Sequence, residues 1–271
     1  LSFENLGVRF AGGRTEIGGE ITLAPVSMDL LARTEDTDLG RLLVVVGARP
    51  TAPVKGQVAG SVHIQGRPEN PSIQIAAQLH DGLIGKMPVS GDLDALLENH
   101  EITVRQLRLS QGKGLLSAAG VIGLQKEIAF QAEAKDFDLG ALNGLFGLPY
   151  ELQGRANMEV SIKGDSSNPE ARLSLNITES SINGVAFERA EGNVTVKDRV
   201  ATIQDMTLAR EGQKAKVYGE IPLVEFISGL SGARTAGEPA RPLDLHVEVP
   251  EGNLGWMGAF YKDLRVPKGT G

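Results

Sequence analysis

The feature that most constrains this chain is an internal repeat. Four residues that favour turns, Gly56, Gly66, Asn70 and Pro71, recur with the same spacing as Gly154, Gly164, Asn168 and Pro169, each shifted by 98 (154−56, 164−66, 168−70, 169−71). Residues 102–109 match 201–208, and 120–124 match 219–223, at a shift of 99 (201−102, 219−120). A fixed period predicts stacked units that bury their apolar surfaces only against their neighbours.

The repeat extends beyond these two copies. Residues 19–23 precede 120–124 by 101, and 36–40 precede 136–140 by 100, which indicates a partial copy at the start. Residues 243–249 match 128–134 at a shift of 115, so the last copy holds about 16 extra residues near 225–242. We therefore expect one elongated body, divided into a partial repeat (1–50), a full repeat (51–150) and a repeat with an insertion (151–271).

Alternating apolar and polar residues with frequent turns predict an all-β fold. In the full copy we expect strands over 56–66, 72–80, 87–97, 101–110, 114–124 and 127–135, followed by one or two helical turns within 138–146. The turns are too short for parallel crossovers, so the strands should form an antiparallel meander. Residues 39–46 are compatible with a short helix or a strand, 225–242 with a mobile loop and 267–271 with a frayed end.

The apolar phase slips once in corresponding strands of the repeat. Ile102 and Val104 are followed by Leu107 and Leu109, and the same odd step of three separates Ile203 from Met206. A one-residue slip turns every later side chain to the other face unless a β-bulge absorbs it. We expect bulges near Arg105-Gln106, Gln204-Asp205 and, by the step from Phe3 to Leu6, Glu4-Asn5.

Composition excludes several classes of function. The net charge of −7 without a basic run argues against nucleic acid, and zero cysteine excludes disulfides and thiolate metal sites. The longest aliphatic run, 42–46, is too short to span a bilayer, and no signal peptide is visible. Because the sequence starts and stops inside a repeat, we expect a piece of a longer protein that carries its targeting signals elsewhere.

Catalytic motifs are weak, so we expect no enzyme, cofactor or metal. The four histidines His63, His80, His100 and His246 fall in different strands and turns, and the segment 111–114 lacks most of a phosphate loop. Four aspartates recur with the repeat, namely Asp36, Asp38, Asp136 and Asp138. Because they follow the repeat, they indicate helix capping or turns rather than acid–base chemistry.

The apolar face is the candidate functional site. Its strands carry Val, Ile, Leu and Ala, and the sequence supplies almost no amphipathic helix to cover them. A dry sandwich or solenoid core is one interpretation. A curved aliphatic groove for acyl chains is the other, favoured by the scarcity of aromatics (4%) and by glycines within strands. The predicted lining is Val58, Val62, Ile64, Ile73, Ile75, Leu79, Ile102, Val104, Ile122, Phe130, Met158, Val160, Ile162, Leu173, Leu175, Ile177, Ile203, Ile221, Leu245 and Val247.

The order of these motifs resembles a known family. The segment 56–66 leading to Asn70-Pro71, then 107–109 with Gly114 and 120–122, and finally 138–140, is similar to the AsmA-like superfamily and within it to the TamB-like group. The resemblance implies a β-taco, which is a long curved sheet around a hydrophobic groove. It further implies a bridge across the periplasm of a diderm bacterium, anchored in the inner membrane, and association with phospholipid transport and with an Omp85-type outer-membrane partner.

Three functions remain open at this point. The first is carriage of phospholipid acyl chains between the two membranes along the groove. The second uses the groove or an edge strand to assist assembly of outer-membrane β-barrel proteins. The third is a passive stalk or adhesin, for which the interior would be filled by protein.

Overall fold

The computed structural model describes residues 1–45, 53–123, 127–140, 151–222 and 244–249. In this part the chain is almost entirely β-strand, with one short helix, α1 (Leu39–Val45). The first strands are β1 (Ser2–Phe10), β2 (Gly13–Leu23), β3 (Val26–Asp38), β4 (Val54–Arg67), β5 (Asn70–Ile84), β6 (Met87–Glu98), β7 (Glu101–Gln111) and β8 (Gly114–Gly123). The later strands are β9 (Glu127–Asp138), β10 (Leu152–Asp165), β11 (Glu170–Ile182), β12 (Val185–Lys197), β13 (Val200–Arg210), β14 (Gln213–Pro222) and β15 (Asp244–Glu248).

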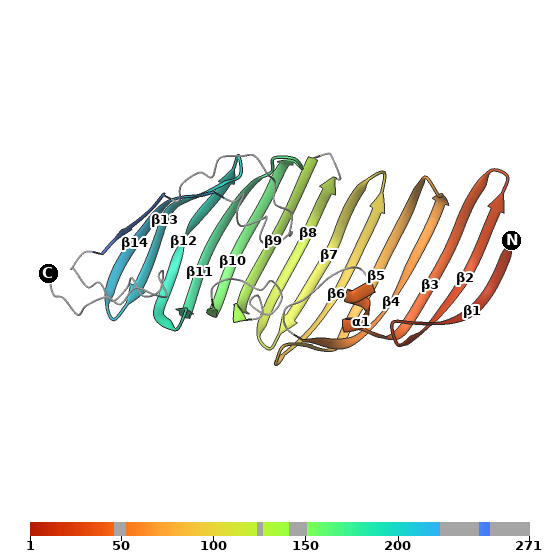
Figure 1. Ribbon diagram of the computed structural model, residues 1–271, viewed down its shortest axis with the longest axis horizontal. Coiled ribbons are helices and arrows are strands. Elements are labelled where there is room, and N and C mark those ends of the chain that lie inside the picture. Colours follow the sequence, from red (N-terminus) through yellow and green to blue (C-terminus); the bar gives the residue numbers. More distant parts are fainter. Residues whose placement is uncertain (46–52, 124–126, 141–150, 223–243, 250–271) are drawn as a thin grey trace. The chain divides into compact units, whose positions relative to one another are not determined.

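The strands form one sheet whose order follows the chain from β1 to β15 (Figure 1). Among the described residues β1 pairs only with β2 and β15 only with β14, so the sheet is not closed. All registers that are resolved are antiparallel, which confirms the predicted meander. The chain divides into two compact units, Leu1–Ala132 with Asp165–Ser167, and Glu133–Gly164 with Asn168–Gly271.

The repeat appears in the structure as a period of six strands. β4 and β10 begin 98 residues apart (152−54), and β7 and β13 begin 99 apart (200−101). All six strands predicted for the full copy are present. The largest boundary error is in β5, which continues past residue 80 to Ile84 because a bulge at Asp81 (φ 49°) carries the strand around a bend.

Residues 39–45 form a helix, while 141–146, the insertion 225–242 and the segments 250–262 and 267–271 lie outside the described residues.

The three predicted bulges are confirmed. Register shifts fall between Phe3 and Leu6, between Val104 and Leu107, and between Ile203 and Met206. A glycine in the neighbouring strand stands opposite each shift with positive φ, namely Gly19 (149°), Gly120 (142°) and Gly219 (137°). A conformation this strongly twisted favours glycine, so bulge and glycine together bend the paired strands.

A second set of bends lies nearer the opposite end of the strands and was not predicted. Register shifts occur between Thr34 and Thr37, between Leu79 and Gly82, and between Gln153 and Arg155. Thr37, which is 2% exposed, lies at the first of these shifts. In the second unit, Phe187, Ala190, Ile203, Leu208, Ala215 and Val217 form the buried cluster.

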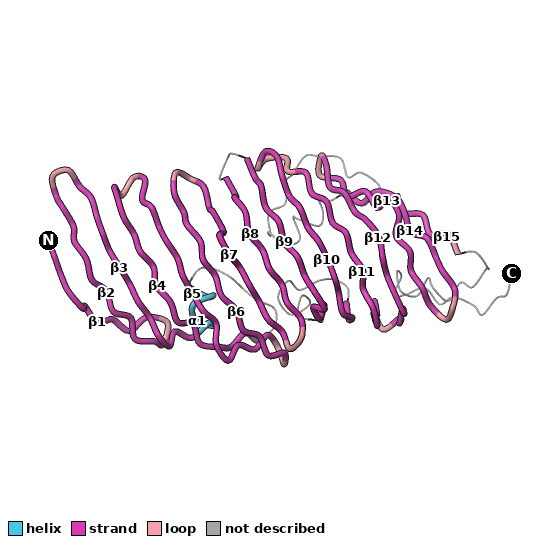
Figure 2. Tube along the Cα trace, turned by 180° about the vertical axis from the view of Figure 1, so that it is seen from behind, coloured by secondary structure: helices cyan, strands magenta, loops and turns pink. Residues whose placement is uncertain are grey.

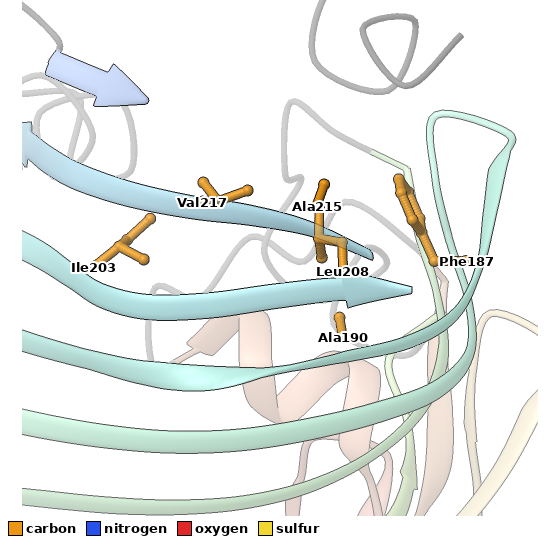
Figure 3. Packing of buried hydrophobic residues seen from close by; sticks show 6 residues of the cluster. All are labelled: Phe187, Ala190, Ile203, Leu208, Ala215 and Val217. Atoms are coloured by element: carbon orange, nitrogen blue, oxygen red, sulfur yellow. The ribbon is translucent and has the colours of Figure 1, made fainter. Parts of the chain in front are cut away.

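Figure 3 shows how this cluster forms: the strand that carries Phe187 bends, so that its ring lies beside Leu208 and Ala215. Phe187 and Leu208 are each 2% exposed. The trace in Figure 2 shows long strands joined by short hairpins from β1 to β3 and from β4 to β8. The core is therefore a narrow band along the bends rather than a layer between two sheets.

Candidate functional site: an apolar face

Residues directly opposite each other in neighbouring strands point to the same face of a sheet. In the first unit, Val62 pairs with Ile75 and Ile64 with Ile73, and these register rows continue across the sheet through Ala95 and Leu97 to Val104 and Ile102. Val58 pairs with Leu79, Ile102 pairs with Ile122, and Gly120 adjoins Phe130. The ten predicted lining residues of this unit therefore share one face, here called the apolar face.

The second unit repeats this arrangement. Met158 pairs with Leu175 and Val160 with Leu173, while Ile162 and Ile177 lie on the same side through their pairings with Ala171 and Ala156. The register continues through β12 to Ile203, then through Gly219 and Ala201 to Leu245 and Ile221. Val247 pairs with Val217 on the same side. The ten predicted residues of the second unit also share one face.

The apolar face carries no ionised side chain at its described central positions. From β1 to β8, the residues that the register places with Val62 and Ile75 are Ala, Gly, Val, Leu, Ile, Met, Phe, three threonines and, near the strand ends, Pro71 and Gln111. Two of the threonine hydroxyls are paired, since Thr34 Oγ1 lies 2.5 Å from Thr37 Oγ1 and donates to the Arg14 carbonyl at 3.2 Å, while the buried Thr15 hydroxyl has no hydrogen-bond partner among the described residues. An unpaired charge removed from water there would cost several kcal/mol, and these positions avoid that cost.

Most of the apolar face is only half-buried. Of the predicted lining residues, Val58 and Ile203 are buried along the bends, Val247 is 43% exposed, and the others are intermediate. Within the described ranges, the substantial contacts between elements join strands adjacent in the sheet, and α1 adds contacts with β3 and β4. The described elements therefore provide no second layer that packs over this face.

The bends contain polar contacts that sequence reasoning missed. The Arg155 guanidinium binds the Asp136 carboxylate through Nε and through Nη2, the latter at 2.7 Å, and Nη2 also donates to the Asp136 carbonyl at 2.9 Å. Asp136 has φ 47°, and its own N–H donates to Asn157 Oδ1 at 3.0 Å. The hydrogen bond to Asp136 raises the pKa of Arg155. This contact holds Asp136 in its positive-φ conformation in β9, and only the recurrence of aspartate at 36 and 136 pointed to it.

The predicted capping role is correct for two of the four aspartates. Asp38 Oδ1 accepts from the Arg41 N–H at 2.8 Å at the start of α1, and Asp138 Oδ1 accepts from the Gly140 N–H at 2.8 Å. Such bonds satisfy amide groups that the first turn of a helix leaves without partners. Asp136 instead serves the bend in β9, and Asp36 lies beside the corresponding shift in β3.

The opposite face is polar and presents no catalytic constellation in the described residues. His63 Nε2 lies 2.7 Å from Asp29 Oδ1, and Gln65 Nε2 donates to Asp29 Oδ2 at 3.0 Å. These bonds, His63 first, lower the pKa of Asp29. The stacked rings of Tyr218 and His246 lie 5.1 Å apart on β14 and β15. Over the described ranges, no three His, Asp or Glu side chains gather to hold a metal ion.

Comparison with known proteins gives one informative match. No family model matches the chain, and no solved structure matches it. The translocation and assembly module subunit TamB of Haemophilus influenzae is 24% identical over 282 residues, which cover 100% of this chain and 20% of TamB. The chain thus spans about a fifth of the length of this relative. A search of the described helices finds none long and apolar enough to cross a membrane.

The similarity runs through both units and both copies of the repeat, because the whole chain takes part in the match. It agrees with an all-β antiparallel sheet whose residues alternate between an apolar and a polar face. The match therefore confirms the resemblance to TamB that the repeat motifs indicate, and the chain is similar from end to end to one segment of a TamB protein.

Proposed function

We propose that this chain is a segment of a TamB-like bridge between the inner and outer membranes of a diderm bacterium, and that its apolar face carries phospholipid acyl chains. The observation that supports the proposal is the uncharged, half-buried aliphatic face, repeated in both units without a covering layer among the described elements. The full protein would be anchored in the inner membrane, reside in the periplasm and work with an Omp85-type partner, as a subunit of a translocation and assembly module.

The physical task explains why no catalytic group is needed. Moving an acyl chain of about fourteen methylenes from a bilayer into water costs about 11 kcal/mol, at about 0.8 kcal/mol per methylene. An aliphatic protein surface that stays in contact with the acyl chain removes most of this free-energy cost. The similarity to TamB and the all-β fold accordingly point to a non-catalytic protein.

Assembly of barrel proteins by strand addition fits the described geometry less well. Strands β2 to β14 each have a neighbour on both sides, so among the described strands only β1 and β15 offer a free edge. Strand addition requires such an edge, whereas acyl chains need only the exposed side chains of the apolar face, which every strand presents. Lipid carriage is therefore the function that this geometry supports better.

The proposal is tested by native mass spectrometry, with lipid extraction, of the chain purified from bacterial membranes without detergent. We expect about one or more phospholipids per chain. Ile75→Asp and Leu175→Asp place a charge on the apolar face of each unit and should lower lipid occupancy at least tenfold, because the buried carboxylate costs several kcal/mol.

Matched controls come from the next residue along the same strands. Gln74 and Ser174 are exposed on the polar face, so Gln74→Asp and Ser174→Asp should leave lipid occupancy unchanged. A folded, lipid-free wild-type chain would contradict the proposal and favour the stalk. Equal lipid loss in the control variants would contradict the assignment of the face.

A further inference from the structure

The two ends of the strands in the first unit differ in charge. Because consecutive strands are antiparallel, the hairpins β1–β2, β5–β6 and β7–β8 lie at one margin of the sheet, and β2–β3, β4–β5 and β6–β7 at the other (Figure 2). We call them the first and second margins. The tips of the first margin are residues 9–14, 84–87 and 111–114, and those of the second are 22–27, 66–71 and 98–101.

The first margin is basic at its tips and the second is acidic. The first carries four cations and no acid, and the second carries one cation and three acids. The charged residues of the first are Arg9, Arg14, Lys86 and Lys113, all exposed. Those of the second are Arg67, Glu69, Glu98 and Glu101. The acid nearest these tips is Asp38 at the end of β3, whose N–H donates to the Ala11 carbonyl at 3.1 Å and whose carboxylate accepts from the Arg41 N–H, while Asp36 and Asp81 lie in the bends behind the tips.

The cations of the first margin are poorly neutralised by the protein itself. Arg9 and Arg14 stand directly opposite each other in the β1–β2 hairpin, an arrangement of like charges that is unfavourable without an anion. Arg14 has Glu16 at 3.0 Å, while Lys86 and Lys113 form no ion pair with any described residue. The β5–β6 and β7–β8 tips are about 10 Å apart, so their potentials overlap at physiological salt.

The apolar face ends beside two of these cations, Lys86 and Lys113, which lie in the hairpin turns. Met87 and Gly114 belong to that face and directly follow Lys86 and Lys113 in the sequence, whereas Arg9 and Arg14 alternate with Phe10 and Gly13 and so lie on the polar face. A ligand that presents hydrocarbon to the face and an anion to the margin would satisfy both. We propose that the first margin of the first unit binds the anionic headgroup of a phospholipid whose acyl chains lie on the apolar face. This inference rests on the proposed function and adds headgroup selectivity and orientation to it.

The second unit provides an internal contrast at the hairpin that corresponds to β7–β8. In the β13–β14 hairpin, Arg210 Nη2 lies 3.3 Å from Glu211 Oε1, so this cation has an acid beside it, whereas Lys113 of the β7–β8 turn has none among the described residues.

The test measures how the whole 271-residue chain extracts lipid from vesicles of phosphatidylglycerol and of phosphatidylcholine with the same acyl chains. The anionic lipid should be preferred at low salt. Lys86→Gln combined with Lys113→Gln should reduce that preference by about fivefold per lysine. The control variant combines Arg67→Gln with Lys163→Gln, which also removes two positive charges. These residues lie at the β4–β5 hairpin of the second margin and at the corresponding β10–β11 hairpin, so the preference for the anionic lipid should stay intact.

The outcomes separate this inference from the proposed function. Extraction of both lipids without preference, or a preference unaffected by Lys86→Gln and Lys113→Gln, would overturn headgroup binding while leaving acyl-chain carriage standing. Failure to extract either lipid would overturn the proposed function, and the headgroup inference with it. Headgroup binding would be supported if the preference for the anionic lipid were lost in high salt and in the variant with Lys86→Gln and Lys113→Gln, but kept in the control with Arg67→Gln and Lys163→Gln.

Discussion

Asp29 shows how single residues of the polar face are held. Its carboxylate on β3 accepts hydrogen bonds from two side chains of the neighbouring strand β4, His63 and Gln65. Bonds to the ionised form favour it, which is why the pKa of Asp29 lies below its ordinary value of 3.8. The exposed site makes this a local effect screened by solvent.

The pH dependence follows from that direction. Because the folded pKa is depressed, the stabilisation by Asp29 is fully present above pH 3.8 and is lost as the pH falls through the folded value. Carbon-detected NMR titration of the Asp29 carboxyl should show a midpoint below 3.8 that rises in His63→Phe. His80→Phe is the control, since His80 is not among the groups that shift Asp29. An unchanged midpoint in His63→Phe would show that this hydrogen bond is absent in solution.

At the scale of the strand, the bend is the feature that organises the site. A bulge in one strand and a positive-φ glycine in the next turn both strands without moving side chains off the apolar face. The bulges near Arg105 and Gln204 could be predicted because the apolar phase slips in the sequence. The bends at Asp81 and Asp136 could not, because their effect depends on pairing with a neighbouring strand, which the sequence of one strand does not specify.

Gly120→Ala tests this bend. A Cβ at Gly120 would lie 2.3 Å from the Ala129 carbonyl oxygen, and its φ of +142° is strained for alanine. We expect a loss of about 3 kcal/mol in the free energy of unfolding, measured by urea denaturation.

Gly7→Ala is the matched control for that measurement. Gly7 lies within β1, has no atom within 4 Å of its added Cβ and has ordinary φ, so the substitution should be neutral or slightly stabilising. Equal stability of the two variants would mean that the close approach of β8 and β9 at Gly120 does not exist.

At the scale of the whole chain, most of the fold could be predicted from the internal repeat of the sequence. Fold class, antiparallel order, six strands per repeat and the shared face of residues such as Ile75 and Leu175 all follow from alternation and period. The burial of Phe187 and Leu208 and the Arg155–Asp136 contact did not, because they arise from bending in three dimensions. The charge difference between the two margins could not be predicted from the sequence either, because the antiparallel strand order decides which hairpins lie at which end of the strands.

The assignment of acyl chains to the apolar face remains a proposal, and photocrosslinking in cells tests it most directly. A photoreactive side chain is placed in turn at Ile75 and Leu175 of the apolar face and at their neighbours Gln74 and Ser174. The account predicts phospholipid adducts at 75 and 175 and none at 74 and 174, following the alternation of the strands. Equal labelling at all four positions, or adducts to protein alone at 75 and 175, would contradict it.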